Sequence, residues 1–100
     1  MLDIILLLII PMHFNADMIA DCNNKDALGC TISEFNSSGT LQYAHIYISN
    51  FTNYSGCHTK TNIIYHELGH VSFYIDYGDS NISSEPYAIA YANNISKDNC

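Results

Sequence analysis

The chain has few basic residues. Only 3 Lys and Arg oppose 10 Asp and Glu among its 100 residues, which gives a formal net charge of −7 at pH 7. Binding to a phosphate backbone requires basic side chains that displace counterions, so this composition excludes nucleic acid as an expected partner. The same charge disfavours adsorption to an anionic lipid surface.

The chain also lacks the length for two hydrophobic cores and the apolar run for a membrane span. One hundred residues, 48% of them hydrophobic, suffice for one modest core. The apolar run Ile4–Ile10 is shorter than the about 20 residues of a spanning helix but has the length of a signal-peptide core. We therefore expect residues 1–20 to be a signal peptide or an N-terminal apolar segment, with a buried strand or an amphipathic anchor as the alternative. Residues 21–100 would form a single domain, with no membrane span in the mature chain.

No C-x-x-C pair is present among the four cysteines, Cys22, Cys30, Cys57 and Cys100. Their irregular spacing disfavours a closed zinc site with four cysteine ligands. An even number of cysteines in a short exported chain predicts two disulfides, and three pairings are possible. A bridge from Cys22 to Cys30 would close the polar loop Asp21–Gly29. Together with five N-x-S/T sequons, these features predict a secreted or extracytoplasmic protein.

Two strands are expected in the first half of the chain. Thr31–Phe35 favours a short strand, and the turn signal Asn36-Ser37-Ser38-Gly39 separates it from Leu41–Ile48. The second strand alternates strictly, so that one face is apolar. That face consists of Ala44, Ile46 and Ile48.

The pattern becomes helical in the second half. A helix is predicted from about Thr61 to Tyr77, with Thr59 or Thr61 as the N-cap and Gly78 just past the C-terminus. Pro86 fits the first turn of a final helix that runs to about Ser96. Strands followed by helices predict a small α+β domain.

The first of these helices should have an apolar face that packs on the core. Gly69 is small, so a neighbouring backbone can approach the helix closely at this point. The residues of the apolar face are Ile64, Leu68, Val71 and Ile75.

The same helix carries the segment His66-Glu67-Leu68-Gly69-His70. Because His66 and His70 are four residues apart, both imidazoles lie on one face of the helix and can reach one Zn²⁺ ion. Two neutral imidazoles, a third protein ligand and an open position for water make up a catalytic zinc site. Glu67 lies too far round the helix to be a natural third ligand. We expect it to accept a proton as water attacks a scissile carbonyl.

Through this segment and the apolar Ile63 and Ile64 before it, the sequence resembles the zincin superfamily of metallopeptidases. The resemblance covers about residues 41–91. It implies that the two histidines bind zinc and that the glutamate is the catalytic base. It also implies that the preceding strand, Leu41–Ser49, lies at the edge of the sheet and binds substrate in an extended conformation. We expect a monomeric zinc endopeptidase that acts on peptide or protein substrates.

Two acids are candidates for the third ligand. Glu85 precedes the small residues Ala88 and Ala92, which resembles the gluzincin arrangement, where a glutamate on a second helix completes the site. Asp76 lies six residues after the second histidine, the position of the last ligand in the metzincin pattern. Phe73 occupies the glycine position of that pattern, so the helix is expected to continue and carry Asp76 away from the metal. The sequence favours Glu85.

Two other classes of function are compatible with the motif. The chain is alternatively a catalytically silent, disulfide-stapled module that binds zinc, or another hydrolase of the deformylase or amidase type. Glu67 favours catalysis, because a pure zinc site needs only the ligands. The oxyanion of the tetrahedral intermediate could be stabilised by any of three tyrosines, and their spacing does not select one. These are Tyr74, Tyr87 and Tyr91.

Overall fold

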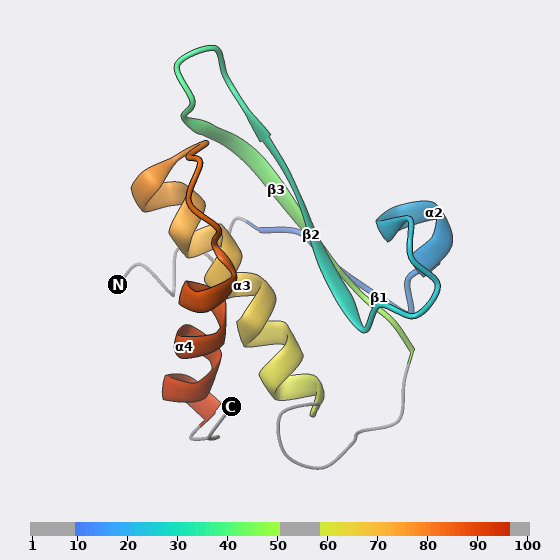
Figure 1. The fold of residues 1–100 in the computed structure, drawn as a ribbon. Coiled ribbons are helices and arrows are strands. Elements are labelled where there is room, and N and C mark those ends of the chain that lie inside the picture. Colours follow the sequence, from blue (N-terminus) through green and yellow to red (C-terminus); the bar gives the residue numbers. More distant parts are fainter. Residues whose placement is uncertain (1–9, 51–58, 97–100) are drawn as a thin grey trace.

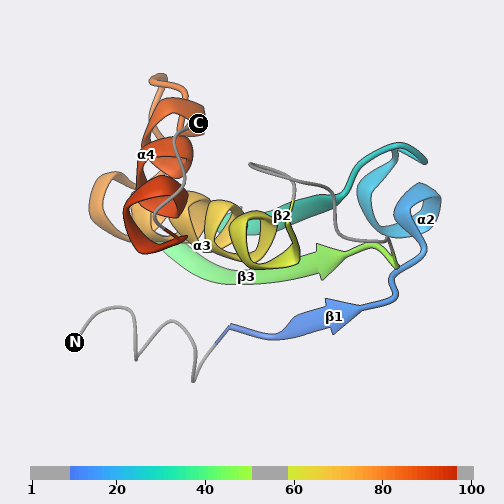
Figure 2. The same cartoon turned by 90° about the horizontal axis from the view of Figure 1, so that it is seen from below.

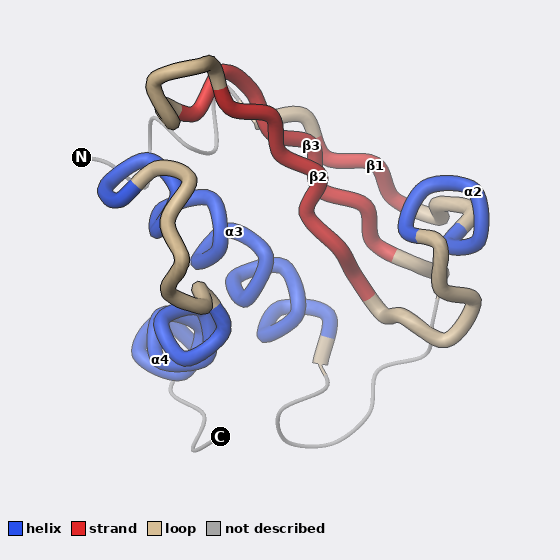
Figure 3. The backbone as a smooth tube through the Cα atoms, turned by 45° about the horizontal axis from the view of Figure 1, so that its top comes forward, coloured by secondary structure: helices blue, strands red, loops and turns tan. Residues whose placement is uncertain are grey.

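The computed structural model describes residues 10–50 and 59–96 and has an α+β fold, which confirms the predicted fold class. The helix α3 (Lys60–Tyr77) lies on one face of a three-stranded sheet, and the helix α4 (Glu85–Ser96) packs on the other side of α3 (Figures 1 and 2). The tube view in Figure 3 shows the resulting order of sheet, α3 and α4. Consequently α3 is covered from two sides.

The sheet has the strand order β1-β3-β2, with β1 (Met12–Phe14), β2 (Gly29–Phe35) and β3 (Leu41–Ile48). β2 pairs with β3 antiparallel, and β1 pairs with β3 parallel. The expectation that residues 41–49 form an edge strand is therefore wrong. The physical reason is β1, which pairs with the side of β3 that the hairpin leaves free. Among the described strands, β2 is the edge strand on the side opposite β1.

Part of the N-terminal segment contributes to this fold. Ile10 belongs to the hydrophobic core, and residues 12–14 form β1. The short helix α2 (Met18–Cys22) follows, with the Asp17 carboxylate accepting hydrogen bonds from two backbone N–H groups of its first turn. Residues 1–9, which contain most of the apolar run, lie outside the described residues.

A disulfide joins Cys22 at the end of α2 to Cys30 in β2. It closes the polar loop as the sequence suggested and connects α2 covalently to the edge strand. Cys57 and Cys100, the other cysteines of the expected second bridge, lie outside the described residues.

The hairpin of β2 and β3 follows the predicted pattern. Ala44, Ile46 and Ile48 are buried on one face of β3. In the turn, Asn36 Oδ1 accepts hydrogen bonds from the backbone N–H groups of residues 38 and 40, and Gly39 has a positive φ of 79°. Because that conformation strains residues with a Cβ, glycine suits this position.

The two long helices begin and end close to the predicted residues. Thr59 is the N-cap of α3, and its hydroxyl accepts a hydrogen bond from the Asn62 backbone N–H. Gly78 ends the helix with a φ of 67°. In the part of the chain that the structure describes, no helix combines the length and apolar character needed to cross a membrane.

The buried face of α3 differs in part from the predicted stripe. Leu68 and Val71 lie in the core as expected, but Ile75 is 39% exposed, which contradicts its predicted burial. Ile75 borders an open groove together with Ile10 and Leu41 instead of being covered. Because α3 is also covered by α4, residues outside the stripe are buried as well. These include Gly69, Ser72 and Phe73.

Candidate metal centre

α4 packs closely on α3 at Gly69. A Cβ at this position would lie 2.8 Å from Ala88 Cα and 3.0 Å from Tyr91 Cβ, and both distances are shorter than an ordinary van der Waals contact. On α4, Ala88 and Ala92 are fully buried. Small residues on both helices let their backbones approach, as the sequence predicted. The consequence is that the first turn of α4 lies beside the two histidines of α3.

His66, His70 and Glu85 form a group that could hold a metal ion. One ligand atom from each residue lies within 4.8 Å of the other two. Glu85 Oε1 is 2.6 Å from His66 Nε2 and 3.2 Å from His70 Nε2. The structure thus brings together the three residues that the sequence favoured. Asp76 is outside this group, exposed in the last turn of a helix that continues past Phe73.

Ser84, directly before Glu85, determines which nitrogen of His70 is available. Ser84 Oγ lies 2.7 Å from His70 Nδ1 and donates to the Tyr74 hydroxyl at 3.2 Å. Because its single proton goes to Tyr74, Ser84 must accept from His70 Nδ1–H. In the neutral imidazole the Nε2 lone pair of His70 then faces Glu85. Sequence reasoning missed Ser84, since a serine before a helix has the pattern of an ordinary N-cap.

This arrangement fits a divalent cation such as zinc. When His70 is neutral, its Nε2 lone pair and a Glu85 oxygen are both acceptors 3.2 Å apart, and a cation bound to both atoms would satisfy them. Tetrahedral zinc with bonds of about 2.0 Å separates its ligand atoms by roughly 3.3 Å. The His70 contact already has this separation, and the 2.6 Å His66 contact needs to widen modestly. Glu85 is 54% exposed in its side chain and has room to adjust.

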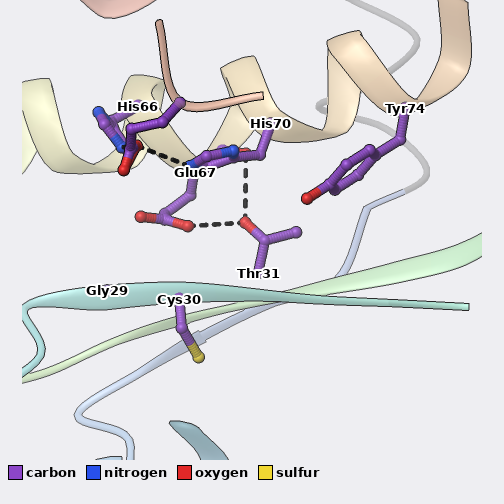
Figure 4. A pocket seen from close by; sticks show the side chains of 8 residues that line it. Gly29, Cys30, Thr31, His66, Glu67, His70 and Tyr74 are labelled. Atoms are coloured by element: carbon purple, nitrogen blue, oxygen red, sulfur yellow. Dashed lines mark hydrogen bonds and ion pairs between the residues drawn. The ribbon is translucent and has the colours of Figure 1, made fainter. Parts of the chain in front are cut away.

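Glu67 is buried beside the ligands, with 7% of its surface exposed. The Thr31 hydroxyl on β2 donates a 2.7 Å hydrogen bond to Glu67 Oε1 (Figure 4). Burial raises the pKa of Glu67 above its ordinary value, and the hydrogen bond from Thr31 and the charge of His66 offset part of that rise. Burial also lowers the pKa of His70, which favours the neutral imidazole that a metal requires.

These side chains surround one cavity of about 370 Å³ between α3 and the edge strand β2 (Figure 4). Of the three tyrosines considered, Tyr74 lines this cavity. The hydroxyl of Tyr87 lies 3.1 Å from Ser72, and Tyr91 packs against the core. The residues that line the cavity are Gly29, Cys30, Thr31, His66, Glu67, His70, Tyr74 and Glu85.

No protein-family model matches this chain, and no curated protein or solved structure matches it. The chemistry of the site therefore has to be inferred from its own geometry.

Proposed function

We propose that this chain is a zinc-dependent peptidase in which His66, His70 and Glu85 hold the metal and Glu67 is the general base. One observation carries the proposal: two imidazoles, an exposed carboxylate and a buried carboxylate meet in one cavity beside β2, an edge strand of the described sheet. A site that only stored zinc would need the ligands alone. The buried Glu67 is the group that zinc storage leaves unexplained.

Zinc held by these three residues would act as a Lewis acid toward a water molecule and the substrate carbonyl. Glu67 would accept the proton of the attacking water and then protonate the leaving amine nitrogen. Tyr74 lines the same cavity and accepts a hydrogen bond from Ser84, so its own proton is available to the substrate. We propose that it donates to the carbonyl oxygen as negative charge develops there.

The substrate would bind in an extended conformation along β2. This strand is an edge of the sheet, and its residues 29–31 line the cavity. Backbone pairing at an exposed edge is a common mode of peptide recognition. The zincin resemblance implied such a role for residues 41–49, which the structure places at the centre of the sheet. β2 extends past the cavity to Phe35, which offers further backbone partners and suits an endopeptidase.

The test compares wild type with Glu67→Gln, both purified with the disulfide intact. Zinc is counted per chain by mass spectrometry, and cleavage of casein and of a peptide library is measured. We expect full zinc occupancy in both proteins and cleavage by wild type alone. Asp76→Asn is the matched control, because it removes the charge of an exposed acid on the same helix. It should keep both zinc and activity.

Other outcomes would replace the proposal. Full zinc occupancy without cleavage of any peptide would support the silent zinc module. Activity restricted to formylated peptides or to cell-wall amides would indicate one of the other hydrolase classes. Absence of bound zinc would overturn the proposal as a whole.

A further inference from the structure

The alternation of β2 places Thr31 on the face that points toward α3. Ile32 and Glu34 are exposed on the opposite face, while Ser33 is partly buried on the same face as Thr31. In Figure 4, Thr31 points toward Glu67 and Cys30 points to the other side of the strand. The edge strand thus places the Thr31 hydroxyl next to the buried Glu67 carboxylate.

Thr31 donates its single hydroxyl proton to the Glu67 side chain. Its Oγ1 is 2.7 Å from Glu67 Oε1 and 3.3 Å from the Glu67 backbone oxygen. The carboxylate is the nearer acceptor, and its charge strengthens the bond. Oε1 is therefore engaged with the strand, which leaves Oε2 as the oxygen that can receive a proton from water.

Gly29, two residues earlier on the same face, limits the position of Glu67 from another direction. A Cβ at Gly29 would lie 3.3 Å from Glu67 Cγ and 2.9 Å from Ile63 Cγ2. A larger side chain at Gly29 would collide with the aliphatic part of the Glu67 side chain. The strand therefore leaves room for the aliphatic part of the Glu67 side chain at Gly29 and binds the Glu67 carboxylate at Thr31.

We propose that Thr31 is a positioning residue that orients the general base, so that the strand that pairs with substrate also sets the direction of Glu67. This inference rests on the proposed peptidase function and adds a residue outside the zinc-binding motif to the same site. A substrate paired with residues 29–31 would be held by the same backbone that anchors the carboxylate. The substrate and Glu67 would then be held in a fixed position relative to each other.

The experiment replaces Thr31 with valine, which has nearly the same shape but no hydroxyl. Thr31→Val should lower kcat for peptide cleavage by about 10- to 100-fold, the usual effect of an outer-shell partner, with KM and zinc content unchanged. Thr31→Ser retains the hydroxyl and should restore most of kcat. Ser33→Ala is the matched control, because it removes a hydroxyl from the same strand face. Within the described residues that hydroxyl has no hydrogen-bond partner.

A binding measurement tests the same point without turnover. A peptide hydroxamate chelates zinc and donates a hydrogen bond to a correctly placed base, whereas the corresponding peptide thiol needs only the metal. Thr31→Val should weaken hydroxamate binding about 10-fold and leave thiol binding unchanged, in line with the loss of an outer-shell partner. If the valine variant does not fold, Thr31→Ala is measured with the same expectations.

The two proposals fail in different ways. Wild type that binds zinc but cleaves no peptide would overturn the peptidase function, and the ratio of hydroxamate to thiol affinity would still report on Thr31. Wild-type cleavage that depends on Glu67, with unchanged kcat and unchanged hydroxamate affinity in Thr31→Val, would overturn the role of Thr31 alone. A uniform loss of zinc and of both inhibitors in Thr31→Val would also refute it, since that result indicates a structural hydrogen bond.

Discussion

Gly69→Ala tests whether close helix packing builds the metal centre. The added methyl group would lie 2.8 Å from Ala88 Cα and 3.2 Å from the Ala88 backbone oxygen. Ordinary carbon–carbon contacts lie at about 3.5 to 4.0 Å, so α4 has to move by roughly 1 Å. Neither contact can be relieved by rotating a side chain, because both atoms belong to the backbone. The displacement reaches the first turn of α4 and therefore Glu85.

Two opposing effects determine the stability of this variant. Overpacking of a close contact costs about 1 to 3 kcal/mol, whereas alanine in place of glycine within a helix gains about 1 kcal/mol. The net change in the free energy of unfolding without metal is thus a loss of roughly 0 to 2 kcal/mol. Zinc affinity should fall by at least about 10-fold, because the third ligand moves away from the other two.

Urea unfolding of the metal-free protein and competition with a chelator measure the two quantities separately. Asp76→Ala provides the comparison for a change at an exposed position of the same helix, and it should leave zinc affinity unchanged. A Gly69→Ala variant that gains the full helix stabilisation and keeps its zinc affinity would show that the helices are not in close contact at this residue. The reasoning that places Glu85 at the site would then be refuted.

Three further predictions concern the same site. Glu85→Gln should lose more zinc affinity than the about 10- to 100-fold typical of outer-shell changes, while Asp76→Asn retains it in the same chelator competition. Tyr74→Phe should lower kcat by about 100-fold with little change in KM, as expected for an oxyanion donor, measured by steady-state peptide cleavage. Zinc content after dialysis should fall below about pH 5 to 6, because protons compete for the imidazoles. Burial lowers the pKa of His70, which shifts this loss to lower pH than an ordinary histidine would give; unchanged zinc at pH 4 would contradict the assignment.

Much of the local structure could be predicted because its causes are local. Capping residues determine where α3 begins and ends, and strict alternation determines which face of β3 is buried. The four-residue spacing of His66 and His70 places them on one helix face in any tertiary context. Ile75 was mispredicted, because periodicity shows which residues share a face of the helix but not how far along that face the core extends.

Pairing between distant segments could not be predicted in the same way. β1 pairs with β3 across more than 30 residues of sequence. A strand of three residues is too short for its hydrophobic pattern to indicate which strand it pairs with. This pairing places β3 at the centre of the sheet. Thr31 was missed for a similar reason, since its hydrogen bond to Glu67 connects residues that are 36 positions apart.

Local pattern was enough to predict α3 and the relative positions of His66, Glu67 and His70 on it, because a helix sets the relative directions of its own side chains. The surroundings of these three side chains depend instead on how distant segments pack together. The close contact between Gly69 and Ala88 brings Glu85 to the histidines, and the sheet order makes β2 the strand beside Glu67. Both depend on how surfaces from separate segments fit together, which no local pattern specifies.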